Sequence, residues 1–209
     1  MAFIQLCKEV RSQMADCHRA GFDSENDCVE DAHGALRLRP AQEADRAFLH
    51  AVFESTRVQE FAQIGWSADR IAALLAEQFS MQDAYYRQHY RHARFDVVML
   101  GETAVGRLYH DWSGGEARLI DIALLPTYRG VGIGTRLMRA FVAHAAERMV
   151  PVVLYVEMNN PVQGLYRRLG FEPAGENGVY LQMRREAAAY RGEGGTMVPG
   201  LVLVGAAAG

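Results

Sequence analysis

The sequence lacks several features that would assign it to whole classes of protein. No apolar run reaches the roughly 20 residues that a membrane-spanning helix needs, and the N-terminal residues do not show the basic-then-apolar layout of a secretory signal. Net charge is −3 at pH 7, so no basic excess indicates nucleic acid or an anionic membrane as partner. Cys7, Cys17 and Cys28 have no metal-site spacing. An odd, clustered set is typical of reduced thiols, and we expect a cytoplasmic protein without a metal.

What is present is ordinary globular composition, with half of the 209 residues apolar and 22% charged, enough for one sizeable core. Residues 1–34 look like an N-terminal extension, with a short amphipathic helix followed by an acidic linker. We expect the compact domain to span residues 35–186. Residues 187–209 turn small and glycine-rich, which predicts a mobile tail.

The first part of the domain predicts one strand and two helices. Alternation over residues 35–39 suits a half-buried strand that ends at Pro40. Apolar residues from Ala44 to Phe53 then trace one face of a helix. A second helix begins after Ser67, a favourable N-cap, and runs to about His89.

The second part predicts strands at residues 95–100, 103–112 and 116–125, joined by tight glycine turns, then a helix over 131–148 and a strand over 151–157. A helix over 161–169 follows, with Asn160 as N-cap and Pro161 at its first position, and a last strand over 178–184. Hairpins early and helical crossovers late indicate an α/β fold with a mixed, mostly antiparallel sheet and helices on both faces.

A phosphate-binding turn is the strongest local signal. The strand Ile120–Leu125 runs through Pro126 into a glycine-rich turn, Arg129 to Gly134, and a helix follows. Free N–H groups at the start of a helix bind anions, and glycines let the backbone approach them. No lysine follows the glycines, which excludes a P-loop. Thr135 or Leu137 occupies the third glycine position of a dinucleotide fingerprint, which excludes that motif too.

Two blocks of sequence carry a family resemblance. Arg129-x-x-Gly132-x-Gly134 resembles the acyl-coenzyme A signature of the GNAT superfamily of N-acetyltransferases. Asn160 to Phe171, with LYRRLGF at its end, resembles the second signature of that family. The blocks are separated by one helix and one strand, as in the family. The resemblance covers roughly residues 35–185 and implies the GNAT fold.

The resemblance implies acetyl-coenzyme A as cosubstrate, no metal, and a set of binding residues. Backbone amides of the turn would hold the pyrophosphate, Arg129 would add charge, and Asn160 would contact the coenzyme or only cap its helix. The strand before the turn would splay from residues 151–157 and pair with the pantetheine arm. An N–H near Ile122 or Ala123 would polarise the acetyl carbonyl. The cofactor-binding candidates are Ile122, Ala123, Leu124, Arg129, Gly130, Val131, Gly132, Ile133, Gly134, Thr135 and Asn160.

Two residues are candidates for proton transfer. The resemblance makes Tyr166 the acid that protonates the departing thiolate, although a tyrosine here is also compatible with a plain core residue. Asp121 is the candidate base, either facing the substrate cleft or paired with an arginine on the other side of the sheet. Glu157 is the alternative base, and the amine can also lose its proton to water.

The acceptor is the least defined partner. By resemblance, residues 53–90 would build its pocket, with Arg57, Glu60 and Trp66 at the mouth. Gln78, Gln82, Tyr85 and His89 continue one helix face, which indicates either a polar pocket or a helix end leaving the core. No dense acidic cluster points to a polyamine. We expect transfer of acetyl to a primary amine of a small molecule or peptide, with a non-catalytic acyl-coenzyme A-binding regulatory module as the alternative and a homodimer as a possibility.

Overall fold

The computed structural model describes residues 35–61 and 65–187. All of them belong to one compact unit. The helix and linker expected in residues 1–34 and the tail from residue 188 onward lie outside the described residues. The predictions for both ends therefore stay predictions.

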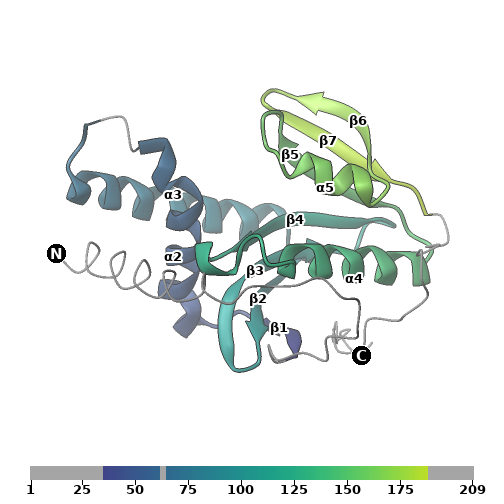
Figure 1. Cartoon of the computed structure of the whole chain (residues 1–209), viewed down its shortest axis with the longest axis horizontal. Helices are drawn as coiled ribbons and strands as arrows, with labels where there is room; N and C mark the ends of the chain where they lie inside the picture. The colour runs from purple at the N-terminus through teal and green to yellow at the C-terminus, as the bar shows by residue number, and fades with distance from the viewer. Residues whose placement is uncertain (1–34, 62–64, 188–209) are drawn as a thin grey trace, which may run out of the picture. The chain divides into compact units, whose positions relative to one another are not determined.

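Seven strands form one sheet in the order β1-β2-β3-β4-β5-β7-β6 (Figure 1). Neighbouring strands of the described sheet are antiparallel except β4 and β5, which are parallel. This confirms the predicted mixed, mostly antiparallel sheet. The strands are β1 (Leu36–Pro40), β2 (Arg94–Leu100), β3 (Thr103–Asp111), β4 (Ala117–Leu124), β5 (Val152–Glu157), β6 (Glu172–Asn177) and β7 (Tyr180–Arg185).

Glycine turns join the three consecutive antiparallel strands β2, β3 and β4. Gly101 between β2 and β3 has φ +58°, and Gly115 between β3 and β4 has φ +73°. Residues with a side chain rarely adopt this left-handed conformation, so glycine at these positions makes the turns tight. The predicted hairpins are therefore present, and their strands end within about one residue of the expected positions.

Helices cover both faces of the sheet (Figure 1). α2 (Arg46–Arg57) and α3 (Ala68–His89) pack with Val97 of β2 in one apolar cluster. α4 (Ile133–Glu147) and α5 (Gln163–Arg168) join a second cluster that contains Val98. Successive strand residues point to opposite faces, so the two clusters lie on opposite sides of the sheet. α3 begins as predicted, because the Ser67 hydroxyl accepts the Arg70 N–H at 3.4 Å.

Strand β6 was not predicted from the sequence. Its residues, EPAGEN, are all exposed, and its pairing with β7 is irregular between Pro173 and Gly175. An edge strand with no buried side has no apolar alternation, and proline with charge protects such an edge from further pairing. The sequence pattern therefore resembled a loop.

The start predicted for the last helix was also wrong. α5 begins at Gln163, with Val162 as its N-cap, and Pro161 precedes the helix. The Asn160 side chain accepts the Val162 N–H through Oδ1 at 3.0 Å, so it stabilises the turn that leads into the helix. Asparagine favours such local turns as strongly as helix caps, which explains the displaced start.

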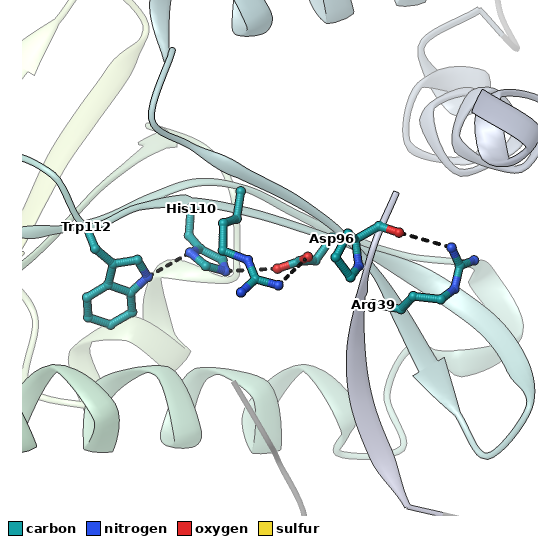
Figure 2. Close-up of polar contacts among 6 residues, drawn as sticks. Arg39, Asp96, His110 and Trp112 are labelled. Atoms are coloured by element: carbon teal, nitrogen blue, oxygen red, sulfur yellow. Dashed lines mark hydrogen bonds and ion pairs between the residues drawn. The ribbon is translucent and has the colours of Figure 1, made fainter. Parts of the chain in front are cut away.

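A chain of polar side chains, buried at its centre, links β2 and β3 on the α4 face of the sheet (Figure 2). The Trp112 Nε1–H donates to His110 Nδ1 at 2.7 Å, so the proton of the neutral imidazole is on Nε2. His110 Nε2 lies 3.2 Å from Oδ2 of Asp96, which is fully buried. Arg94 donates to Oδ1 of the same carboxylate at 3.1 Å. Each charged group in this chain therefore has a partner.

Candidate active site

Strands β4 and β5 pair at one end and then separate, as the sequence predicted. Their pairing runs only from Ala117↔Val152 to Leu119↔Leu154, although the strands continue to Leu124 and Glu157 (Figure 1). We call the open stretch beyond Leu119 and Leu154 the fork. Within it, the facing backbone groups of the two strands do not bond to each other.

A β-bulge lies where the fork begins. Tyr109 of β3 faces Asp121, whereas the next residue, His110, faces Leu119. Ile120 is therefore an extra residue on β4. A bulge bends its strand and increases the local twist, which accounts for the turn of β4 away from β5.

The register of β4 decides which N–H groups face the fork. The Leu125 N–H donates to Val105 O at 2.9 Å, so alternate residues, including Ala123, direct their N–H groups at β3. Ile122 and Leu124 direct theirs away from β3, into the fork. Of the two residues expected to polarise the acetyl carbonyl, Ile122 has the suitable orientation and Ala123 does not.

The phosphate turn has the backbone geometry that an anion requires. Gly130 and Gly132 have φ values of +78° and +88°, and a Cβ on either would meet no atom within 4 Å. α4 follows with Gly132 as N-cap and no capping side chain, and its first hydrogen bond runs from the Arg136 N–H to Gly132 O at 3.0 Å. The N–H groups of residues 133–135 precede any intrahelical acceptor, so they are available to an anion.

Arg129 is held within the protein. Its Nε donates to Leu124 O at 2.7 Å, and Nη2 donates to the Ser55 hydroxyl at 2.7 Å. Burial lowers the pKa of this guanidinium. The side chain therefore ties the turn to the end of β4 and to α2, and its expected contribution of charge to the pyrophosphate stays a prediction.

Sequence reasoning missed the importance of Gly106 on β3. It faces Leu124, and a Cβ at this position would lie 2.3 Å from Ala123 O. Only glycine lets β3 and the fork strand approach so closely. Gly134, by contrast, lies inside α4, where a Cβ would make an ordinary contact at 3.9 Å.

Tyr166 is a buried residue of α5. It is 5% exposed, and its ring centroid lies 5.8 Å from that of Phe171. Burial, with a smaller contribution from the negative charge of Asp121, raises the pKa of the Tyr166 phenol to about 12. The two candidate proton-transfer residues therefore lie close enough to influence each other electrostatically.

Asp121 is paired with an arginine, one of the two alternatives that its position on the strand left open. Its Oδ2 lies 2.7 Å from Nη2 of Arg107, which also donates to Gln82 of α3 at 3.1 Å. Burial disfavours the charge of Arg107, but Asp121, together with Tyr109 and Tyr86, outweighs burial, so the pKa of Arg107 is raised. Among the described residues, Asp121 Oδ1 accepts no hydrogen bond and Arg107 Nε–H has no partner.

A pocket of about 390 Å³ opens on the α3 side of the sheet beside the fork. Of the α3 residues expected to face the acceptor, Tyr85 lines this pocket and Gln82 contacts Arg107. His89 stacks on Tyr85 with ring centroids 3.9 Å apart. The predicted mouth residues do not line it: Arg57 pairs with Glu60, and Trp66 lies under Arg70. The residue pattern of α3 alone could not predict the other lining residues, because α3, β4, β5 and the β6–β7 hairpin contribute them together.

Two searches of the described residues, 35–61 and 65–187, gave negative results. No group of three or more His, Cys, Asp or Glu side chains is arranged to hold a metal ion there. None of the helices in this part of the chain is long and apolar enough to cross a membrane.

A mixed sheet that forks beside an uncapped, glycine-rich helix start is the architecture of an acyl-coenzyme A-dependent transferase. The family model described as "Acetyltransferase (GNAT) family" matches residues 58–171, more than half of the sequence. The chain therefore belongs to the GNAT acetyltransferase family, as the two sequence blocks predicted.

The individual proteins that resemble this chain share 30% or less of its sequence in the examples that follow. The chain is 30% identical over 86 residues to mouse thialysine N-epsilon-acetyltransferase, covering 40% of this chain and 51% of that protein. It thus matches only about half the length of this relative. The PaiA N-acetyltransferase of Thermoplasma acidophilum, solved with coenzyme A, has a TM-score of 0.56 at 20% identity, covering 73% of this chain and 99% of that one. Spermidine N-acetyltransferase of Vibrio cholerae, solved with coenzyme A and spermine, gives 0.53 at 19% identity over 75% and 98%. Both structures support the fold.

Proposed function

We propose that this chain transfers the acetyl group of acetyl-coenzyme A directly to a primary amine of a small molecule or peptide. One observation carries the proposal: the fork that begins at Leu119 leads along β4 to the uncapped start of α4 at Gly132. A pyrophosphate at the turn and an extended arm in the fork would occupy one continuous run of backbone donors. The family and the names of its relatives, including an amine acetyltransferase of the mouse, support this activity.

The residues fit the coenzyme. The N–H groups of residues 133–135 would bind its pyrophosphate, and the open space at Gly130 and Gly132 leaves room for the phosphates. The N–H groups of Ile122 and Leu124 would pair with the pantetheine amides as an added strand does. Ile122, nearer to the start of the fork, would donate to the acetyl oxygen as negative charge develops on it.

The reaction requires one proton to leave and one to arrive. The amine nitrogen forms a bond to the acetyl carbonyl carbon, the carbon–sulfur bond breaks, the nitrogen loses a proton and the sulfur gains one. Asp121 accepts the first proton, directly or through water, at Oδ1, while Arg107 holds Oδ2. Tyr166, with a pKa of about 12, remains protonated at neutral pH and donates to the departing sulfur.

Ligand binding provides the first test. Acetyl-coenzyme A at about 100 times its Kd adds about 2.7 kcal/mol of stability and raises Tm by several degrees. ADP and NADH at the same concentration serve as comparison ligands. Stabilisation by NADH but not by acetyl-coenzyme A would contradict the proposed cosubstrate.

Turnover provides the second test. Release of free coenzyme A thiol is measured with a panel of primary amines, with an amine-free reaction as the blank. We expect thiol release that depends on the amine. Binding of acetyl-coenzyme A without turnover of any amine would instead favour a non-catalytic regulatory module.

A further inference from the structure

The α3-side pocket lies where an acceptor would meet the fork. Leu119, the last β4 residue paired with β5, lines it, as does the bulge residue Ile120. Tyr155, the first β5 residue beyond the paired stretch, lies opposite them. α3 covers the face opposite α4. An acceptor in this pocket would therefore approach the thioester from the α3 face of the sheet. The coenzyme would be anchored on the opposite face, at the N-terminus of α4.

Aromatic side chains dominate the wall of the pocket. The lining tyrosines are Tyr85, Tyr86, Tyr90, Tyr155 and Tyr180. Three of them, Tyr85, Tyr155 and Tyr180, are 53%, 42% and 40% exposed, so part of each ring is open to a ligand. Tyrosine offers an apolar face and a hydroxyl at low entropic cost, which suits an apolar or aromatic body with a few polar groups.

The charge of the wall points to an anionic group on the acceptor. Arg118 is the charged residue among those lining the pocket, and no aspartate or glutamate joins it there. Its Nη2 lies 2.7 Å from Glu116, which also lies 3.4 Å from Arg184. Glu116 thus anchors one arm of Arg118, while a guanidinium has five N–H donors in a planar fork that matches a carboxylate. A polyamine would instead need carboxylates in the wall.

Resting on the acetyl transfer proposed above, we propose that the acceptor is a small carboxylate-bearing amine of amino-acid size. Its carboxylate pairs with Arg118, its body lies against the tyrosines, and its amine faces the fork. A volume of about 390 Å³ lies near the lower end of the range for ligand pockets, which fits such a molecule. Removal from water lowers the pKa of the bound amine. The neutral form, which attacks the thioester, is thereby favoured.

Matched pairs of acceptors test the carboxylate. L-phenylalanine is compared with phenethylamine, and L-lysine with cadaverine; spermidine and an amidated tetrapeptide complete the panel. Free thiol release by the full-length chain gives kcat and KM for each. At least one amino acid should exceed its decarboxylated counterpart by about tenfold or more in kcat/KM, mainly through KM.

Substitutions of Arg118 test whether this residue causes the preference for amino acids over their decarboxylated counterparts. Arg118→Gln should raise KM for the preferred amino acid about tenfold and so remove most of its advantage over the decarboxylated counterpart, whereas Arg118→Lys should retain part of that advantage. Arg184→Gln is the matched control, because Arg184 also contacts Glu116 but does not line the pocket. It should keep the preference intact. Thermal unfolding of each variant with acetyl-coenzyme A establishes that the cosubstrate site is folded.

The outcomes separate the two proposals. Equal or faster turnover of the decarboxylated amines, of spermidine or of the tetrapeptide overturns the acceptor class while leaving acetyl transfer in place. A preference that survives Arg118→Gln overturns the role of Arg118. Stabilisation by acetyl-coenzyme A without turnover of any panel member overturns the transferase proposal, and the acceptor class with it.

Discussion

The Oδ2 oxygen of Asp121 on β4 lies 2.7 Å from Nη2 of Arg107 on β3, and both side chains are largely shielded from solvent. Arg107 lies over the ring of Tyr109, with its guanidinium carbon 5.3 Å from the centroid. The ion pair fixes the orientation of the carboxylate beside the fork and leaves Oδ1 to take part in chemistry. A structural role and a catalytic role for Asp121 are therefore compatible and need separate measurements.

Asp121→Asn should lower kcat/KM about 100-fold, the usual contribution of a positioned proton acceptor. The amide keeps an oxygen for Arg107 but removes the negative charge that compensates the buried guanidinium, so Tm should also fall, and kcat/KM is compared at a temperature at which the variant is folded. The diagnostic measurement is the Kd of acetyl-coenzyme A, which should stay near the wild-type value while kcat falls. Glu157→Gln is the comparison, because Glu157 is the alternative base; a loss of kcat/KM in that variant alone would exchange the two assignments.

Tyr166→Phe should lower kcat about 100-fold and leave the Kd of acetyl-coenzyme A nearly unchanged, because only the hydroxyl is removed from a buried ring. With a pKa of about 12, the wild-type phenol stays protonated throughout a normal assay range. An alkaline limb below about pH 11 should therefore persist in the variant. Unchanged turnover in Tyr166→Phe would reduce Tyr166 to a core residue.

The raised pKa of Tyr166 also predicts a pH dependence of stability. In the unfolded chain the phenol loses its proton near pH 10, whereas in the folded chain it does so near 12. The folded state therefore holds one more proton between these values, and its stability falls as pH rises through them. Removing this tyrosine should lessen the decline by up to about 1.4 kcal/mol per pH unit. Denaturant unfolding at pH 9, 10 and 11 compares wild type with Tyr166→Phe; parallel curves would contradict the shift.

Much of the fold could be predicted because its elements bury one side. α3 was bounded at Ser67 and His89 by a cap and an apolar stripe, and the strands β2, β3 and β4 by the glycine turns between them. Strand β6 has no buried residue, so it has no pattern to detect. Its existence depends on β7 as a partner, which is a tertiary effect.

Some features of the candidate site could also be predicted from the sequence, and others could not. The turn at Gly130 and Gly132 could be predicted, since its conformation depends on glycine itself. The partner of Asp121 could not, because strand alternation gives the phase of side chains only until a bulge resets it, and Ile120 is such a bulge. Arg118 likewise joins the acceptor pocket only once the sheet register is known.

Gly106→Ala should destabilise the fold and weaken acetyl-coenzyme A binding together. The new Cβ would lie 2.3 Å from Ala123 O, so β4 must shift, and such overpacking costs about 1–3 kcal/mol. The shift moves the N–H groups of Ile122 and Leu124. Thermal unfolding and ligand titration should show both effects. Gly114→Ala is the matched control, with no atom within 4 Å and an ordinary φ; an equal loss in that variant would point to backbone entropy instead.

Asp96→Ala should destabilise the domain by about 3–5 kcal/mol, because it leaves the His110 Nε2–H and Arg94 facing a site without their carboxylate. The chain of contacts in Figure 2 lies on the α4 face of the sheet and includes no residue of the fork or the pocket, so kcat of the folded fraction should remain near wild type. Glu102→Ala breaks the exposed pair with Arg37 and should cost no more than about 1 kcal/mol. Urea unfolding gives both values. Similar costs for the two variants would mean that the buried carboxylate contributes no more than a surface one, and a large loss of kcat in Asp96→Ala would mean that this chain of contacts supports the active site.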